Sequence, residues 1–182
     1  MISKWIDKKI NYNGAQLKPL YAYMNHGLHG DSIVAFSGSC NVSWEHMIDG
    51  EDLLARSEIK ADSMLHFIVE IFPAHLPSAV TTQRLLVALA RELFQEKGVV
   101  LKRSGDDLYH GEKKLSVSIA SVSAVSAMIH LGINIENSGT PVKTCALSDF
   151  SLDTQVFAEE LMSIFVSEIK SIQAATKKVR PL

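Results

Sequence analysis

Cysteine is scarce in this sequence, and its placement excludes several classes of protein. The two cysteines among the 182 residues, Cys40 and Cys145, lie far apart and form no Cys-x-x-Cys pair. A disulfide-rich secreted scaffold and the common zinc motifs are therefore excluded. Free thiols in a reducing cytoplasm are the simplest interpretation, and a disulfide between the two cysteines is the alternative. Neither cysteine is assigned a role.

Long apolar runs, internal repeats and an excess of one charge are also missing. No window approaches the ~18 uninterrupted apolar residues of a membrane span, and the amino-terminal stretch MISKWIDKK has no apolar core of signal-peptide length. The formal net charge of −2 gives no global field that would attract nucleic acid or an anionic membrane. We therefore predict a cytoplasmic protein with no nucleic-acid partner and no membrane partner.

What is present is an apolar fraction of 47%, enough for one domain with an ample core. We predict a single domain over residues 1–182, with a disordered tail after about residue 176. The residue patterns predict strands at 32–36, 64–72, 99–101, 115–122 and 127–135, and long helices at 78–97 and 153–175. They also predict a hairpin within 3–17 around Asn13-Gly14, a short helix near 19–28, a loop after Phe36, and helical turns within 44–57. Strands mixed with two long helices predict an α+β fold, with a mixed, largely antiparallel sheet and helices on one face.

Alternation along three of these strands separates an apolar face from a face of small and polar side chains. In 115–119, Leu115, Val117 and Ile119 alternate with small or polar residues, and the strands at 65–71 and 127–135 divide in the same way. We expect the apolar faces to contact the helices. Small side chains beside polar ones leave the space that a concave ligand site requires, and a solvated sheet face is the alternative. The candidates on this open face are His66, Glu70, Lys114, Ser116, Ser118, His130, Gly132 and Asn134.

Two stretches resemble the central signature of the biotin and lipoate protein ligase superfamily. They are 102-KRSGDDLYHGEKKLSVSIA-120 and 128-MIHLGINIE-136. In the superfamily a basic segment leads to an Asn-Asp-Leu turn, a hairpin tip, a Lys-Leu or Lys-Ile pair and a strand, and a second strand ends in Gly-Ile-Asn. Here Asp107, Lys114 and Gly132-Ile133-Asn134 stand at the matching positions. The whole chain, with DSIVAF and MLHFIVE, also resembles the prokaryotic family catalogued as domain of unknown function 366.

The resemblance implies a biotin/lipoate ligase-like, class II synthetase-like fold and an acyl-adenylate chemistry. In that chemistry a carboxylic acid attacks the α-phosphate of ATP, and the acyl group then passes to a lysine of an acceptor protein. The resemblance implies that Lys114 is the catalytic residue, because a compact positive charge stabilises carboxylate and phosphate oxygens. It also implies that Asp107 holds a metal or a nucleotide group, and that Gly132 and Asn134 line the nucleotide end. ATP and Mg²⁺ are expected as cofactors by resemblance alone.

The chain departs from the superfamily pattern where phosphate would be bound. The first half contains no Gly- and Arg-rich loop, and the nearest candidate for an anion or carboxylate cradle is 37-SGSCNVS-43, with Ser37, Gly38 and Ser39. Two functions therefore stay open: ligand binding with acyl or adenylyl transfer, and a non-catalytic ligand-binding or protein-interaction module on the same scaffold. We expect the ligand to be a small carboxylate or nucleotide-like molecule and predict no metal site of the protein's own. An exposed sheet edge would allow a homodimer.

Overall fold

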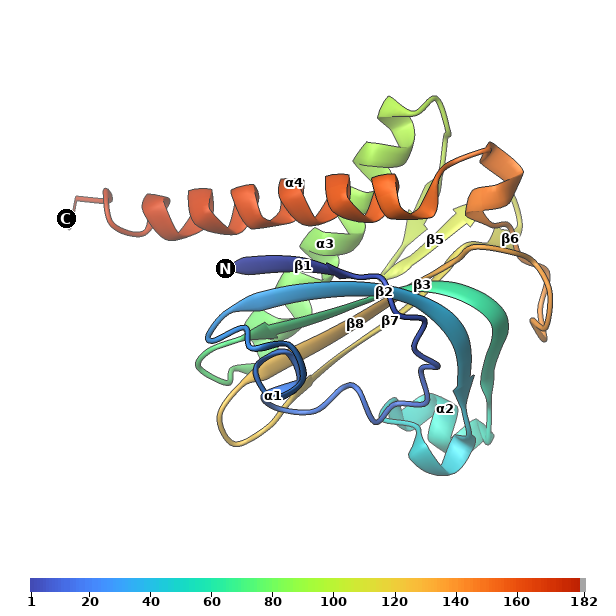
Figure 1. Cartoon of the computed structure of the whole chain (residues 1–182), viewed down its shortest axis with the longest axis horizontal. Coiled ribbons are helices and arrows are strands. Elements are labelled where there is room, and N and C mark those ends of the chain that lie inside the picture. The colour runs from blue at the N-terminus through green and yellow to red at the C-terminus, as the bar shows by residue number, and fades with distance from the viewer. Residues whose placement is uncertain (181–182) are drawn as a thin grey trace.

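A five-stranded sheet runs through the middle of the molecule, and the computed structural model describes residues 1–180 of the chain (Figure 1). The strands are β1 (Ile2–Ile6), β2 (Ser32–Val42), β3 (Ile59–Ile71), β7 (Ser116–Val122) and β8 (Ala127–Asn134). They stand in the order β1-β2-β3-β8-β7; β1 pairs in parallel with β2, and the other neighbours are antiparallel. The predicted mixed, largely antiparallel sheet is therefore confirmed. A second, small sheet consists of β4 (Lys102–Ser104), β5 (Asp107–His110) and β6 (Lys113–Lys114).

The two long helices, α3 (Leu76–Glu96) and α4 (Thr154–Ala175), lie on one side of the large sheet, as Figure 1 shows. The side chain of Asp153 caps α4 by accepting a hydrogen bond from the Val156 amide. The apolar stripes of both helices pack on the sheet and form the main hydrophobic core. Both predicted long helices are thus confirmed. None of the described helices is long and apolar enough to cross a membrane.

Residues 7–31 first follow the edge of β2, where the amides of Ile10 and Tyr12 bond to its carbonyls, and then cover part of the opposite face of the sheet. They include the short helix α1 (Tyr21–His26), which confirms the helix predicted near 19–28. This segment passes so close to β2 that a Cβ on Gly38 would overlap the backbone carbonyl of Ile10. A second, smaller core forms between the segment and the sheet. Its buried members are Ile6, Tyr12, Tyr21, Ala22, Val34, Phe36, Cys40, Val42, Ala61, Met64 and Ile68.

Three local predictions are wrong. Asn13-Gly14 forms a turn, with Gly14 at a φ of 91°, but its flanks do not pair as a hairpin. The first strand pairs instead with β2, because there it completes the edge of the main sheet and also packs against α4. The loop predicted after Phe36 does not exist, since the small residues there continue β2. The short strand predicted at 99–101 is displaced to β4.

The connection between β2 and β3 carries a 3-10 turn (Trp44–His46) and the helix α2 (Gly50–Ala55), which match the predicted helical turns. No residue of either element is buried, so this connection stands out from the sheet (Figure 1). At the other end of the chain, α4 ends at Ala175. Residues 181–182, which belong to the predicted tail, lie outside the described residues.

Candidate functional site

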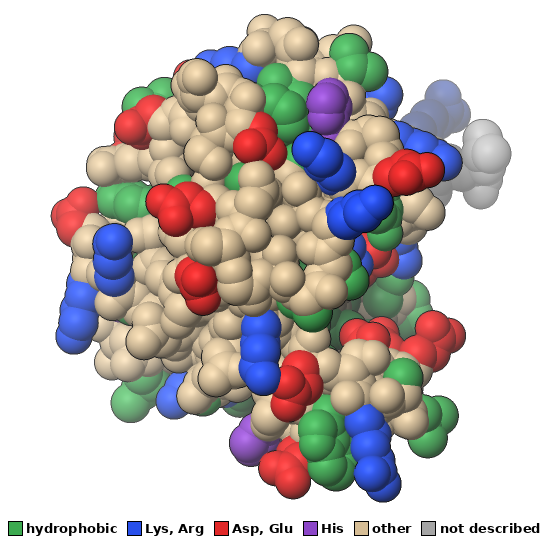
Figure 2. Space-filling view, turned by 90° about the vertical axis from the view of Figure 1, so that its right-hand side faces the viewer, with side chains coloured by type: hydrophobic (Ala, Val, Ile, Leu, Met, Phe, Trp, Pro, Cys, Tyr) green, Lys and Arg blue, Asp and Glu red, His purple; other side chains and the backbone are tan. Residues whose placement is uncertain are grey.

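A pocket of about 480 Å³ opens beside β7, on the part of the sheet face that residues 7–31 leave uncovered. Met64 of β3 and Asn134 of β8 form its floor, Asp107 and Lys114 come from the small sheet, and the connection with α2 forms the facing wall. This volume lies within the range of about 300–1,000 Å³ that is typical of small-molecule sites. Figure 2 shows the α2 end of the molecule, where acidic and basic side chains are interspersed.

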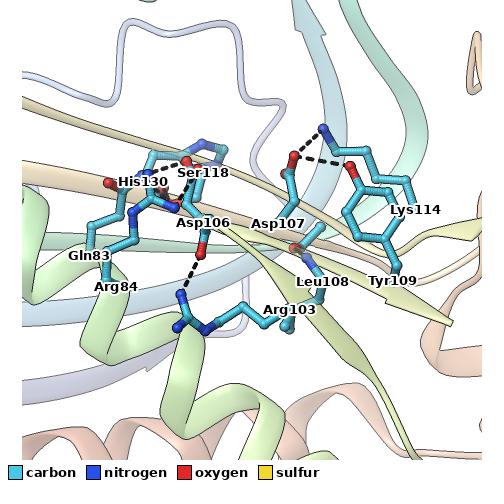
Figure 3. A network of polar contacts seen from close by, with 12 residues as sticks. Gln83, Arg84, Arg103, Asp106, Asp107, Leu108, Tyr109, Lys114, Ser118 and His130 are labelled. Carbon is cyan, nitrogen blue, oxygen red and sulfur yellow. Dashed lines mark hydrogen bonds and ion pairs between the residues drawn. The ribbon is translucent and has the colours of Figure 1, made fainter.

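Lys114 and Asp107 form an ion pair at this pocket. β5 and β6 are antiparallel neighbours joined by a tip at Gly111, whose φ is 61°, and this hairpin places Lys114 Nζ 2.8 Å from Asp107 Oδ2 (Figure 3). The hydroxyl of Tyr109 donates to the same oxygen at 3.3 Å. Burial, and then the charge of Asp107, raise the pKa of Tyr109, so its hydroxyl keeps the donated proton. The side chains of Lys114 and Asp107 are 30% and 25% exposed, so their pair is partly solvated.

The neighbouring Asp106 has a different role, because it points toward α3. Arg84 Nη1 lies 3.1 Å from its carboxylate, and Gln83 Nε2 donates to it at 2.9 Å and to Ser118 Oγ at 3.0 Å (Figure 3). This network ties the small sheet to the helix and to the edge strand β7. Sequence analysis missed Gln83 and Arg84. A signal existed for Gln83, a polar residue within the apolar stripe formed by Ala79, Leu86 and Ala90.

The predicted placement of Ser116 and Ser118 on the open face is wrong. Directly paired residues of antiparallel strands point to the same face. Ser116 pairs with Ile133 and Ser118 with Leu131, and both partners belong to the main core on the helix side. Leu115 interrupts the extended segment between β6 and β7. This interruption reverses the faces of the sheet to which the following side chains point, relative to the alternation that the sequence suggests.

The hydroxyls of the two serines are consequently used in structural hydrogen bonds. Ser116 Oγ accepts from the Leu108 amide at 3.0 Å, and Ser118 Oγ donates to the carbonyl of His130 at 2.8 Å. Both residues line the pocket only along its border with the edge strand β7. Val117 and Ile119, which were expected on the helix side, face the open side instead, because they pair with Gly132 and His130. A Cβ on Gly132 would lie 3.2 Å from Val117 Cγ2, so glycine leaves room for this contact.

Asn134 lies at the end of β8 and is nearly buried, with 4% of its surface exposed. Its Nδ2 donates to the backbone carbonyl of Lys114 at 3.3 Å and to that of Cys145 at 3.1 Å. Because both amide protons are used, the orientation of the amide group is determined by its surroundings. Asn134 is thus placed in the pocket together with Lys114 and Asp107.

His66, His130 and Glu70 lie on the predicted face of the sheet, but none of them lines the Lys114 pocket. His66 Nδ1 is 3.0 Å from His130 Nε2, and Tyr12 stacks on the His130 ring at a centroid distance of 3.9 Å. Burial lowers the pKa of His66 to about 4, and burial together with His66 lowers the pKa of His130 well below its usual value. Both rings are therefore neutral near pH 7. His130 borders a smaller cavity of about 70 Å³, which adjoins the Lys114 pocket at Val117 and Asp52.

Glu70 has a structural role, because its carboxylate bonds to two distant parts of the chain. Its Oε1 accepts a hydrogen bond from the Leu20 amide at 2.7 Å and one from Ser126 Oγ at 2.6 Å. Leu20 has a φ of 62°, which is unfavourable for a branched side chain, and the carboxylate holds it at the start of α1. Glu70 thus fastens the covering segment to the sheet.

Ser37, Gly38 and Ser39 lie away from Lys114, in a hollow that shares no lining residue with its pocket. They belong to β2, where the carbonyl of Ser37 accepts from the Ile10 amide and that of Ser39 from the Tyr12 amide. They therefore do not form the loop that was expected to bind an anion or a carboxylate.

The two cysteines are both free and buried, so the disulfide alternative is wrong. Burial raises the pKa of the Cys40 thiol to about 12 and also raises the pKa of the Cys145 thiol. A thiol needs to lose its proton to act as a nucleophile. Neither cysteine is therefore suited to act as a nucleophile.

Comparison with known proteins identifies the family. Residues 1–180 match the model of the family described as Domain of unknown function (DUF366). The chain belongs to the DUF366 family. A solved structure, "Protein of Unknown Function from Pyrococcus horikoshi", is 39% identical to this DUF366 protein, covers 99% of both chains and gives a TM-score of 0.94.

More distant solved structures show the fold. A mutant biotin protein ligase from Aquifex aeolicus in complex with biotin matches with a TM-score of 0.61 and 12% identity, over 93% of this chain and 70% of its own. Lipoate-protein ligase A bound with ATP matches with a TM-score of 0.57 and 12% identity, over 92% and 85%. The DUF366 protein therefore has a biotin/lipoate ligase-like α+β fold, as the sequence resemblance implied. At this identity the comparison concerns the scaffold alone.

The charged side chains that line the pocket of the DUF366 protein do not suit a nucleoside triphosphate. A triphosphate is bound by arginines, lysines and free backbone amides, but none of the described lining residues is an arginine. Carboxylates outnumber lysines around the pocket by six to two. Within residues 1–180, no group of three or more His, Cys, Asp or Glu side chains is arranged to hold a metal ion. The charged lining residues are Asp49, Glu51, Asp52, Glu58, Asp106, Asp107, Lys60 and Lys114.

Proposed function

We propose that this DUF366 protein binds a small carboxylate-bearing molecule in the pocket beside β7, and that Lys114 contacts the carboxylate. The observation that carries the proposal is the ion pair of Lys114 with Asp107, which borders a pocket of about 480 Å³. A partly exposed ion pair contributes only about 0–1 kcal/mol. A ligand carboxylate can therefore share the ammonium group with Asp107 at little cost in free energy.

The scaffold supports a ligand of this kind. The A. aeolicus structure of the same fold contains biotin, a small carboxylic acid. Lysine suits the task because its ammonium group is a point charge with three donors on a flexible stem. Asn134 adds a polar group that its two backbone contacts hold in place.

Acyl or adenylyl transfer in this pocket is the second candidate function, and the position of Lys114 on a ligase-like scaffold favours it. Two features oppose it. The lining does not suit a triphosphate, and both thiols are buried with raised pKa values. Binding without catalysis is therefore the function that we propose first.

Calorimetric titration with octanoate, 8-aminooctanoate, lipoate and biotin tests the proposal. At least one of these should bind, and Lys114→Ala should weaken that binding by about tenfold or more, as expected for loss of a charge-assisted hydrogen bond. Lys113→Ala is the matched control, because Lys113 is exposed and does not line the pocket. The proposal fails if none of the four acids binds, or if both variants bind as the wild type does.

A pyrophosphate-release assay with each acid, ATP and Mg²⁺ separates the two candidate functions. We expect no release above the rate without acid. Release that depends on the acid and is abolished by Lys114→Ala would establish adenylyl transfer instead.

A further inference from the structure

We infer that the ligand of the Lys114 pocket is an amino carboxylate, with an ammonium or other N–H donor group in addition to its carboxylate. This inference rests on the proposed function and specifies its substrate class. Lys114 would bind the carboxylate of the ligand, whereas the rest of the pocket is acidic and favours a positively charged group. Six carboxylates line it, against two lysines.

Part of this negative charge is already balanced within the protein. Asp106 pairs with Arg84, and Asp107 pairs with Lys114. Glu58 pairs with Lys60. The other three lining carboxylates have no such partner among the described residues. Asp52 lines the pocket and forms no ion pair with any described residue. A ligand whose only charge is a carboxylate would neutralise Lys114 and leave the negative charge of Asp52 unbalanced. An ammonium group on the same ligand would be attracted to that charge.

Asn134 provides an independent indication. It lines the pocket and is 4% exposed, and its Nδ2 protons are directed to the carbonyls of Lys114 and Cys145. The polar atom left for the pocket is Oδ1, which can only accept hydrogen bonds and accepts none from the described residues. Oδ1 itself is not fully buried, so it is accessible from the pocket. A ligand N–H group beside the carboxylate-binding Lys114 would satisfy it.

Octanoate and 8-aminooctanoate form a matched pair of probes, because they differ only in the terminal amine. In calorimetric titrations of the wild type at low salt, we expect 8-aminooctanoate to bind about tenfold more tightly than octanoate. The ratio of the two affinities is the readout, since a partly unfolded sample lowers both affinities equally. N-acetylated 8-aminooctanoate, which keeps one N–H and loses the charge, should give an intermediate affinity.

Three variants locate the preference. Asp52→Asn removes one carboxylate from the wall, and Asn134→Ala removes the acceptor; each should lower the ratio by about threefold or more. Glu112→Gln is the control, because Glu112 is exposed at the hairpin tip and does not line the pocket, so it should keep the wild-type ratio.

The inference is overturned if octanoate binds as tightly as 8-aminooctanoate, or if neither Asp52→Asn nor Asn134→Ala changes the ratio. Lys114-dependent binding of octanoate would then leave the proposed function intact while the amino carboxylate is rejected. If no carboxylate binds, the proposed function and the inference both fail.

Discussion

Residues 7–31 cover one part of the sheet face opposite α3 and α4, whereas the other part stays open as the Lys114 pocket. Both parts carry the small and polar side chains that indicated a ligand site. In the covered part, His66 bonds to His130, and Glu70 bonds to Leu20 and Ser126. In the open part, Lys114 and Asp107 stay partly exposed. Polar residues on a sheet face thus stabilise the fold where a segment covers them, and are available to a ligand only where none does.

The largest expected effect comes from separating the covering segment from the sheet. Gly38→Ala places a Cβ against the backbone carbonyl of Ile10, and backbone cannot yield as a flexible side chain would. We expect a loss of about 3 kcal/mol in the free energy of unfolding, measured by urea denaturation. Gly50→Ala is the control, since its Cβ would meet nothing within 4 Å, and it should change stability by less than about 0.5 kcal/mol. Equal stabilities of the two variants would contradict the tight closure of this part.

The covered part should also make stability depend on pH. In the folded protein the pKa of His66 is lowered to about 4 and that of His130 is also lowered, whereas both are near 6.5 in the unfolded chain. Between these values the unfolded chain binds more protons, so stability falls as the pH decreases from 6.5 toward 4. Each histidine contributes a slope of up to about 1.4 kcal/mol per pH unit.

Urea denaturation between pH 7 and pH 5 measures this slope. His130→Gln removes one of the two buried rings and should flatten the dependence, whereas His110→Gln removes an exposed ring and should not. If His130→Gln keeps the wild-type slope, the buried pair is not the source of the pH dependence.

The smallest effect on stability is expected in the open part. Lys114→Met keeps the apolar stem and removes the charge from a partly exposed pair, so it should lower the free energy of unfolding by less than about 1 kcal/mol. The same urea denaturation checks this value. A loss above about 2 kcal/mol would show that Lys114 is a structural residue like Glu70, and would remove the contrast between the two parts.

Regular central strands made the face assignment of β3 and β8 predictable. Each lies between two neighbours, so the alternation of His66 with Leu65 and of Gly132 with Leu131 holds along the strand. The face assignment of the edge strand β7 was not predictable in this way, because Leu115 interrupts the extended conformation where the chain leaves the small sheet. A break of one residue moves every following side chain to the other face, and nothing in the local pattern marks it.

The amino-acid sequence by itself determined the long helices and the central strands β3 and β8, because periodicity acts over a few positions. Its motifs also resembled those of the family to which the chain belongs. Only the tertiary structure decided which polar residues share a pocket. The covering of Glu70 depends on Leu20, which lies 50 positions earlier in the chain. The pairing of Asp106 with Arg84, and of Asn134 with the backbone at Lys114, likewise depends on contacts between distant positions. Such contacts arise when layers pack together, and local sequence carries no record of them.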